Sequence, residues 1–404
     1  MEAIHMQLPA KSDSTDPPAV TPRAAALFFS TQEQRVTLAR EMFFEEGQRP
    51  SGLVSELVIQ SWMRCAVANR RPSEKIHLEP VSKARISRAL ERNRLLLHAA
   101  CSDLQELDAV LAGTRCKALL TGPDGVLIQA TPTARGEGSL MPCVARLGVN
   151  LNETHLGTTA PSVVMRTGEA CVVRGSEHFF TTISVMHCAA TPIRDARGDL
   201  AGVLDLSIEG DNFRFDATAM VRLYATAIEN RLFEAQSASL LLLRFQSSPA
   251  LLQTPLVGLA AVDGNGGVAW LNQTGAKLLG TERVPTDSGD TEALFGLGLE
   301  DLLSLYHRGK PQPCLLPNGL TLWIHAGKEL SREKNIEPAL SAKRDRIADV
   351  QAITTLHRAN HSLIESTLAT CNGNVSLAAR QLGVSRGLLY RKLRAMCSSP
   401  KTVP

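Results

Sequence analysis

The feature that most constrains this chain is a corner between two short helices near residue 383. Asn374 can cap a helix that begins at Val375, and Gly383 supplies the left-handed residue that ends it. Ser385 can then cap a second helix. Because Ala379 is small enough for the two helices to cross closely, this pattern predicts a helix-turn-helix.

The second helix of this corner carries a cationic face. Leu389 and Leu393 recur at the helical period and are expected to point inward, while arginine and lysine occupy other faces. Such a helix fits the major groove, so we expect Arg386, near its start, to reach base edges. Arg391 and Lys392 are expected to meet phosphates. The alternative is a solvated basic hairpin that does not bind DNA.

The run from Ser385 to Leu393 resembles the Fis-type helix-turn-helix at the C-terminus of bacterial enhancer-binding regulators, over about Ile353 to Met396. Leu388 stands where that family commonly has Thr, which removes a hydroxyl that could touch DNA. The resemblance also implies a homodimer formed by the preceding helix, against the alternative of an intramolecular core helix. Together, residues and resemblance predict DNA contacts at Ser385, Arg386, Leu388, Tyr390, Arg391, Lys392 and Arg394.

The bulk properties indicate a folded chain of several domains. With 404 residues the chain is too long for a single core. No apolar run approaches the roughly 20 residues of a membrane span, and Met1 to Pro22 shows no export signal. Nine cysteines without regular spacing suit a reducing compartment, so we expect a cytoplasmic protein that does not bind membranes.

The middle of the chain predicts an α+β fold. Short apolar runs at Ala118 to Thr121, Val126 to Gln129, Ala170 to Val173 and Ala201 to Ile208 are separated by turn signals, as in an antiparallel sheet. A helix is expected at Asp216 to Leu243. A second, smaller α+β unit ends in a hairpin at Leu315 to Ala326.

These patterns predict seven segments. In chain order they are a disordered tail (1–23), a helical lead-in (24–111), a GAF-like sensor (112–236), a connector helix (237–250), a PAS-like unit (251–328), a linker (329–346) and an all-α Fis-type helix-turn-helix domain (347–404).

Several motifs before residue 234 are similar to those of acetoin-catabolism-type activators. They include Ser61 to Cys65, Leu147 to Ala160, Gly175 to Phe180, His187 to Ile193 and Gly198 to Ser207, in the same order. The resemblance implies a GAF domain that senses a small molecule, and the smaller unit looks like a weak PAS domain. The candidate effector pocket comprises His178, Phe180, His187 and Cys188, although a plain core role for these residues stays open.

Such activators normally carry a central ATPase domain and a loop that engages sigma-54. The sequence contains no glycine-rich phosphate loop ending in Gly-Lys-Ser/Thr, so we expect a regulator without its own ATPase, with a contact to RNA polymerase as a further possibility. No catalytic residue, metal site or cofactor is expected. The competing interpretations are a GAF-fold redox enzyme with a cysteine nucleophile, and a ligand-binding adaptor that does not act on DNA.

Overall fold

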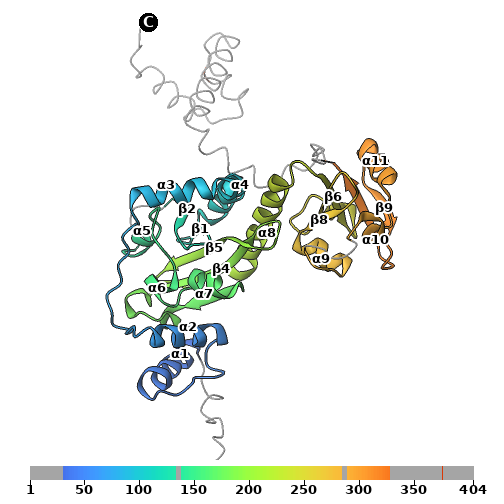
Figure 1. Cartoon of the computed structure of the whole chain (residues 1–404). Coiled ribbons are helices and arrows are strands. Elements are labelled where there is room, and N and C mark those ends of the chain that lie inside the picture. The colour runs from blue at the N-terminus through green and yellow to red at the C-terminus, as the bar shows by residue number, and fades with distance from the viewer. Residues whose placement is uncertain (1–30, 133–137, 284–288, 328–374, 376–404) are drawn as a thin grey trace, which may run out of the picture. The chain divides into compact units, whose positions relative to one another are not determined.

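The computed structural model describes residues 31–132, 138–283 and 289–327, together with Val375. The chain divides into two compact units, Met1–Leu330 and Ser331–Pro404. The described part of the first unit contains two antiparallel β-sheets with helices packed against them (Figure 1). At this level the predicted α+β class is confirmed.

The first sheet is antiparallel throughout, in the order β2-β1-β5-β4-β3. Its strands are β1 (Lys117–Thr121), β2 (Leu127–Ala130), β3 (Cys171–Arg174), β4 (Met186–Arg194) and β5 (Leu200–Glu209). Four of them lie where strands were predicted, whereas β4 was not predicted as a strand. Pro192 weakens its strand pattern, because proline cannot donate to a ladder. The structure tolerates it because β3 pairs with β4 only as far as Ala190.

Helices cover both faces of this sheet. Leu120 and Leu204 enter the core under α4 (Arg94–Leu111) and α8 (Ala217–Gln236). On the opposite face, α7 (Ala160–Thr167) packs on β4 and β5 and is covered by α2 (Glu56–Val67) (Figure 1). The remaining helical elements of this region are α1 (Gln32–Arg40), η2 (Glu41–Glu45), α3 (Lys83–Arg92), α5 (Met141–Val144), α6 (Glu153–Leu156), η3 (Gly175–Glu177) and η4 (Thr181–Ile183).

The second sheet has the order β8-β7-β6-β10-β9 and is also antiparallel. Its strands are β6 (Leu241–Gln246), β7 (Gly258–Val262), β8 (Val268–Leu271), β9 (Gln312–Leu315) and β10 (Thr321–Ala326). The helical elements beside it are η5 (Pro249–Leu251), α9 (Gln273–Leu279), α10 (Thr291–Phe295) and α11 (Leu299–Arg308). The hairpin predicted to close this unit is confirmed as β9 and β10.

The connector helix predicted for 237–250 is wrong. Helix α8 ends at Gln236, short of the predicted Leu243, and the apolar run that follows forms β6, the central strand of the second sheet. Short apolar runs suit a buried helix or a buried strand equally well. Here the segment forms a strand because pairing with β7 and β10 supplies hydrogen-bond partners for its backbone N–H and C=O groups, which are buried on both faces of the sheet.

A buried asparagine pair joins α8 to the second sheet. Asn272, which is 3% exposed, caps α9 by accepting from the Gly275 N–H at 2.7 Å and also accepts from the Leu259 N–H at 2.9 Å. Its amide nitrogen donates to Asn230 Oδ1 on α8 and to the Val257 carbonyl, both at 2.8 Å. All four hydrogen-bonding positions of this side chain are therefore used.

We expect Asn272→Asp to lower the free energy of unfolding by about 3 kcal/mol, because the carboxylate cannot donate to Asn230 or Val257 and is buried. Urea unfolding of the full chain measures this. The control is Asn265→Asp, the same change at an exposed turn position, with an expected effect below about 0.5 kcal/mol. Equal effects of the two substitutions would contradict the asparagine pair as a stabilising link.

Candidate functional site

An interior cavity lies on the face of the first sheet that is opposite α4 and α8. Its volume is about 20 Å³, roughly the space of one or two water molecules. We call it the sheet cavity. It is lined by Leu119, Val144, Leu151, Leu156, Thr159, Pro161, His178, Ile183, Met186, Cys188, Asp205 and Ser207, all of them buried.

Four polar side chains form a connected row in the wall of the sheet cavity. The Ser207 hydroxyl lies 2.6 Å from Asp205 Oδ2 and 3.1 Å from Cys188 Sγ. Cys188 Sγ in turn lies 3.6 Å from His178 Nε2. The other ring nitrogen of His178 lies 2.8 Å from the Gly175 carbonyl oxygen, which can only accept, so Nδ1 carries the proton. The cavity thus combines apolar walls with a few converging polar groups, which is the composition of small-molecule sites at a much smaller volume.

Burial disfavours the charged form of each titratable group in this row. It lowers the pKa of His178 to about 4 and raises the pKa of the Cys188 thiol well above its usual value. Burial also raises the pKa of Asp205 to about 7, opposed by the hydrogen bond from Ser207. Around neutral pH, His178 is therefore a neutral imidazole, Cys188 is a thiol, and Asp205 is close to half protonated.

Helices α1 and α2 hold the loop that presents His178. Arg40 Nη1 donates to the carbonyl oxygens of Ser176 at 3.0 Å and of His178 at 2.9 Å. The indole nitrogen of Trp62 donates to the Glu177 carbonyl at 2.8 Å. Trp62 is fully buried, so it stabilises the loop from within the core and does not line the cavity.

The motifs at Ser61 to Cys65 and Leu147 to Ala160 meet in a polar clamp. Arg64 donates to both carboxylate oxygens of Glu153 at 2.8 Å, and Ser61 donates to the same carboxylate. Ser61 also lies 2.8 Å from the Thr158 hydroxyl. The hydrogen bonds that Arg64 donates to Glu153 raise the pKa of Arg64. This clamp fixes α6, which supplies Leu156 to the cavity wall, so these motifs act on the site through positioning.

The four residues of the predicted effector pocket do not all meet. His178 and Cys188 line the sheet cavity. Phe180 is fully buried beside it, where its ring contacts Phe179 and faces the Arg70 guanidinium at 4.8 Å. His187 points to the other side of β4 because adjacent strand residues alternate between faces.

Asp205 and Ser207 were missed by the sequence reasoning, which treated their strand as a run of apolar residues. A signal was present, since a carboxylate inside the run from Ala201 to Ile208 must be buried if the neighbouring positions form core. Both residues lie two apart on β5 and therefore share one face. That face is the cavity wall.

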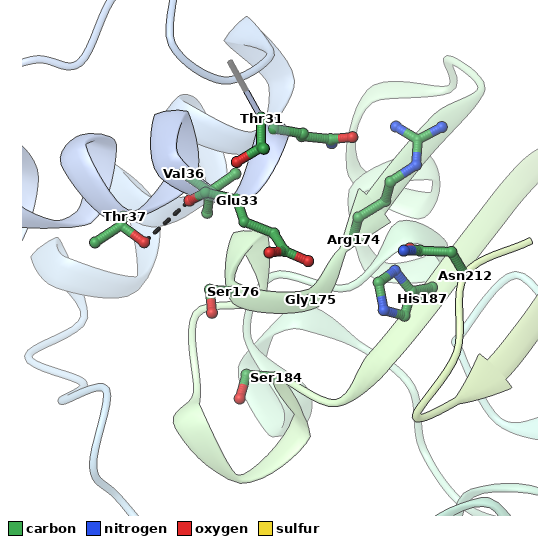
Figure 2. A pocket seen from close by; sticks show the side chains of 11 residues that line it. Thr31, Glu33, Val36, Thr37, Arg174, Gly175, Ser176, Ser184, His187 and Asn212 are labelled. Atoms are coloured by element: carbon green, nitrogen blue, oxygen red, sulfur yellow. Dashed lines mark hydrogen bonds between the residues drawn. The ribbon is translucent and has the colours of Figure 1, made fainter. Parts of the chain in front are cut away.

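His187 lies in a second hollow, an open groove of about 590 Å³ between α1 and the start of the η3 loop (Figure 2). There Glu33 of α1 faces Arg174 and His187 (Figure 2). Burial, together with Arg174, lowers the pKa of His187. The groove borders Thr31, where the described residues begin, whereas every residue lining the sheet cavity is described. The sheet cavity is therefore the better defined candidate site.

The chemistry of Cys188 bears on the competing redox enzyme. A nucleophilic or redox-active cysteine needs a lowered thiol pKa, and burial shifts the pKa of Cys188 in the opposite direction.

Within the described ranges, no three His, Cys, Asp or Glu side chains gather as metal ligands would. Among the helices that the structure describes, none has the length and apolar character needed to cross a membrane.

The residues predicted to contact DNA all lie outside the described residues. Ser385, Arg386, Leu388, Tyr390, Arg391, Lys392 and Arg394 fall within 376–404. Their proposed roles therefore depend on the sequence and on likeness to other proteins.

Two family models match this chain. Residues 30–221 match the model described as the MimR N-terminal domain, which spans the lead-in helices and the first sheet. Residues 355–396 match the model described as bacterial regulatory protein, Fis family. The second match coincides with the predicted helix-turn-helix.

Named relatives share the first region. The acetoin catabolism regulatory protein of Cupriavidus necator is 29% identical over 262 residues, which cover 62% of this chain and 39% of that protein. MimR, the propane 2-monooxygenase operon transcriptional activator of Mycolicibacterium smegmatis, is 29% identical over 171 residues, covering 42% of this chain and 28% of MimR. The crystal structure of the E. coli DhaR(N)-DhaL complex aligns with a TM-score of 0.43 and 15% identity, covering 67% of this chain and 99% of that chain.

Both family matches and both curated relatives are regulatory proteins, so the likeness is to transcriptional regulators and not to enzymes. More narrowly, the chain resembles the acetoin-type regulators and has a Fis-type helix-turn-helix region, as predicted. It spans well under half the length of these two curated relatives.

We expect Asp205→Asn to remove a pH dependence of stability. The carboxyl pKa is about 7 in the folded chain and near 3.9 when unfolded, so the unfolded chain releases this proton first. Because the pKa of Asp205 is higher in the folded chain, the free energy of unfolding falls as the pH rises from about 4 to about 7. The decrease is at most about 1.4 kcal/mol per pH unit. Above pH 7 the loss levels off.

The measurement is urea unfolding of the parent chain and of Asp205→Asn at several pH values from 4.5 to 8. His178 is common to both proteins and cancels in the difference between their unfolding free energies. A difference that stays constant from pH 4.5 to 7 would show that Asp205 is not a buried carboxyl of raised pKa.

Proposed function

We propose that this chain is a DNA-binding transcriptional regulator controlled by a small-molecule effector. The observation that carries the proposal is the Fis-family match at residues 355–396. This match covers the segment in which helix caps, a glycine corner and a basic helix face independently predict a recognition helix that binds the major groove of DNA.

The effector is assigned to the sheet cavity. The support is its position in the region that matches the MimR N-terminal domain, together with its apolar walls and its row of polar groups. The names of the relatives refer to acetoin catabolism and to a propane 2-monooxygenase operon, so their regulons concern compact carbon compounds. The sheet cavity holds only one or two water molecules, so the more compact the effector, the less its wall has to move.

The remaining parts of the proposal concern organisation. The segments 112–236 and 251–328 are assigned as a GAF-like sensor and a PAS-like unit, and 347–404 as the DNA-binding domain. A homodimer would place two recognition helices about 34 Å apart, which favours a palindromic site. The chain acts on DNA in the cytoplasm, without an ATPase of its own, and contacts RNA polymerase.

We expect Arg386→Ala to weaken binding to the specific site by about 1 to 3 kcal/mol, the cost of losing one base contact. Electrophoretic retention of a fragment selected from genomic DNA by the full chain measures it. The matched control is Arg308→Ala, an exposed arginine on α11, with unchanged affinity expected. If the parent chain retains no fragment, or if both substitutions act alike, the DNA-binding assignment is wrong.

Lys392→Ala should instead weaken binding to every DNA sequence by a similar factor, because a phosphate contact carries no sequence information. Affinity measured between about 50 and 200 mM salt should show a log-log slope reduced by roughly one. A parent-like slope would remove Lys392 from the phosphate-contacting surface.

A further inference from the structure

We infer that Asp205 recognises the effector, and that carboxyl oxygen Oδ1 accepts a hydrogen bond from a hydroxyl group of a compact, uncharged molecule in the sheet cavity. This inference rests on the effector part of the proposed function. It adds the chemical class of the effector and the residue that selects it.

The first observation is an unpaired oxygen. Asp205 is 1% exposed and lines the sheet cavity, and its Oδ1 has no hydrogen-bond partner among the described residues. Its other oxygen, Oδ2, is engaged by Ser207 at 2.6 Å. Buried polar atoms are nearly always paired, so an unpaired one in a cavity wall marks a position that a ligand can satisfy.

The second observation is the direction of the hydrogen bonds in the polar row. Because Nδ1 of His178 donates to Gly175, its Nε2 can only accept, and the Cys188 thiol must be the donor at 3.6 Å. When Asp205 is protonated on Oδ2 it donates to Ser207, which then donates to Cys188. When Asp205 is ionised, Ser207 donates to it instead. In both of these states Oδ1 is an acceptor, and when the proton sits on Oδ1 instead, with Ser207 donating to Oδ2, Oδ1 is a donor. A hydroxyl group serves every one of these states, because it can both donate and accept.

The side chains that line the sheet cavity favour a ligand whose hydrogen-bond donor is uncharged. Among the described residues that line the cavity, none carries a positive charge at neutral pH, since burial lowers the pKa of His178 to about 4. Lys117 lies opposite Ser207 in the sheet register but does not line the cavity. A carboxylate ligand would therefore be buried beside Asp205 with no positively charged side chain among the described residues that line the cavity. A neutral hydroxyl compound avoids this cost.

The volume limits the size of the effector. About 20 Å³ accommodates one or two water molecules, so any larger molecule must displace side chains in the cavity wall. Met186 and Ile183 line the cavity, and methionine adapts readily because it is unbranched. The fewer atoms the effector has, the smaller this rearrangement needs to be, which favours a molecule of few carbon atoms.

The test is calorimetric titration of the purified full chain with matched pairs that differ in one hydroxyl. The pairs are acetoin with 2-butanone and 2,3-butanediol with 2-butanol, and lactate serves as the anionic probe. In at least one pair, we expect the compound with the additional hydroxyl group to bind at least about tenfold more tightly than the compound without it. The compound without that hydroxyl leaves Oδ1 of Asp205 unpaired. Lactate should bind at least about tenfold more weakly than the compound with the additional hydroxyl group.

Two variants whose side chains branch at Cγ, as that of aspartate does, separate recognition from folding. Asp205→Asn retains a carbonyl oxygen when its amide nitrogen takes the place of Oδ2 and donates to Ser207, so it should keep the preference for the hydroxyl compound. Asp205→Leu removes the acceptor, and the two members of the pair should then bind within about twofold of each other. Circular dichroism and thermal unfolding of both variants confirm the folded state before titration.

Three results would overturn the inference: equal binding of paired compounds by the parent chain, tighter binding of lactate, or no binding of any hydroxyl compound at millimolar concentration. A preference that persists in a folded Asp205→Leu protein would also overturn it. DNA retention by the same proteins reports separately on the proposed function, because Asp205 lies outside the helix-turn-helix region.

Discussion

The antiparallel pairing of β4 with β5 is the constraint on which the rest of the first unit depends. Its register sets Cys188 opposite Ser207, which brings the polar side chains of the two strands together on the cavity face. The intervening residues, such as Ala189 and Leu206, enter the core under α4 and α8. A slip of one residue would exchange the two sets, burying polar groups in the core and removing them from the cavity.

The same strand pair connects the cavity to the second sheet. Helix α8 packs on β4 and β5 and buries side chains from Ala217 to Leu232 in the shared core, while its Asn230 bonds to Asn272. The chain then leaves α8 and directly becomes β6, the central strand of the second sheet. Contacts therefore run without interruption from the cavity wall to the core of the second sheet, through elements that are packed on both sides.

Much of the fold was accessible from periodicity and turn chemistry. The α+β class, four strands of the first sheet and the hairpin of the second unit follow from short apolar runs that are separated by turn residues. The strands β4 and β6 were not predicted, because Pro192 disturbs the pattern of the first and the leucine run of the second also suits a helix. Only the pairing partners of these strands resolve the ambiguity.

The candidate site divides in the same way. Resemblance of the motifs to those of acetoin-type regulators indicated His178 and Cys188 as candidate site residues. The helix caps around Gly383 could be predicted from the local sequence, because capping depends on neighbouring residues. That Cys188 meets Ser207 and is linked through it to Asp205, and that His187 is not, follows from strand register and from which face α7 covers. Local sequence specifies caps, turns and periods because these act within a few residues. Distant polar groups are brought together only when two strands pair and a helix buries one face of the sheet.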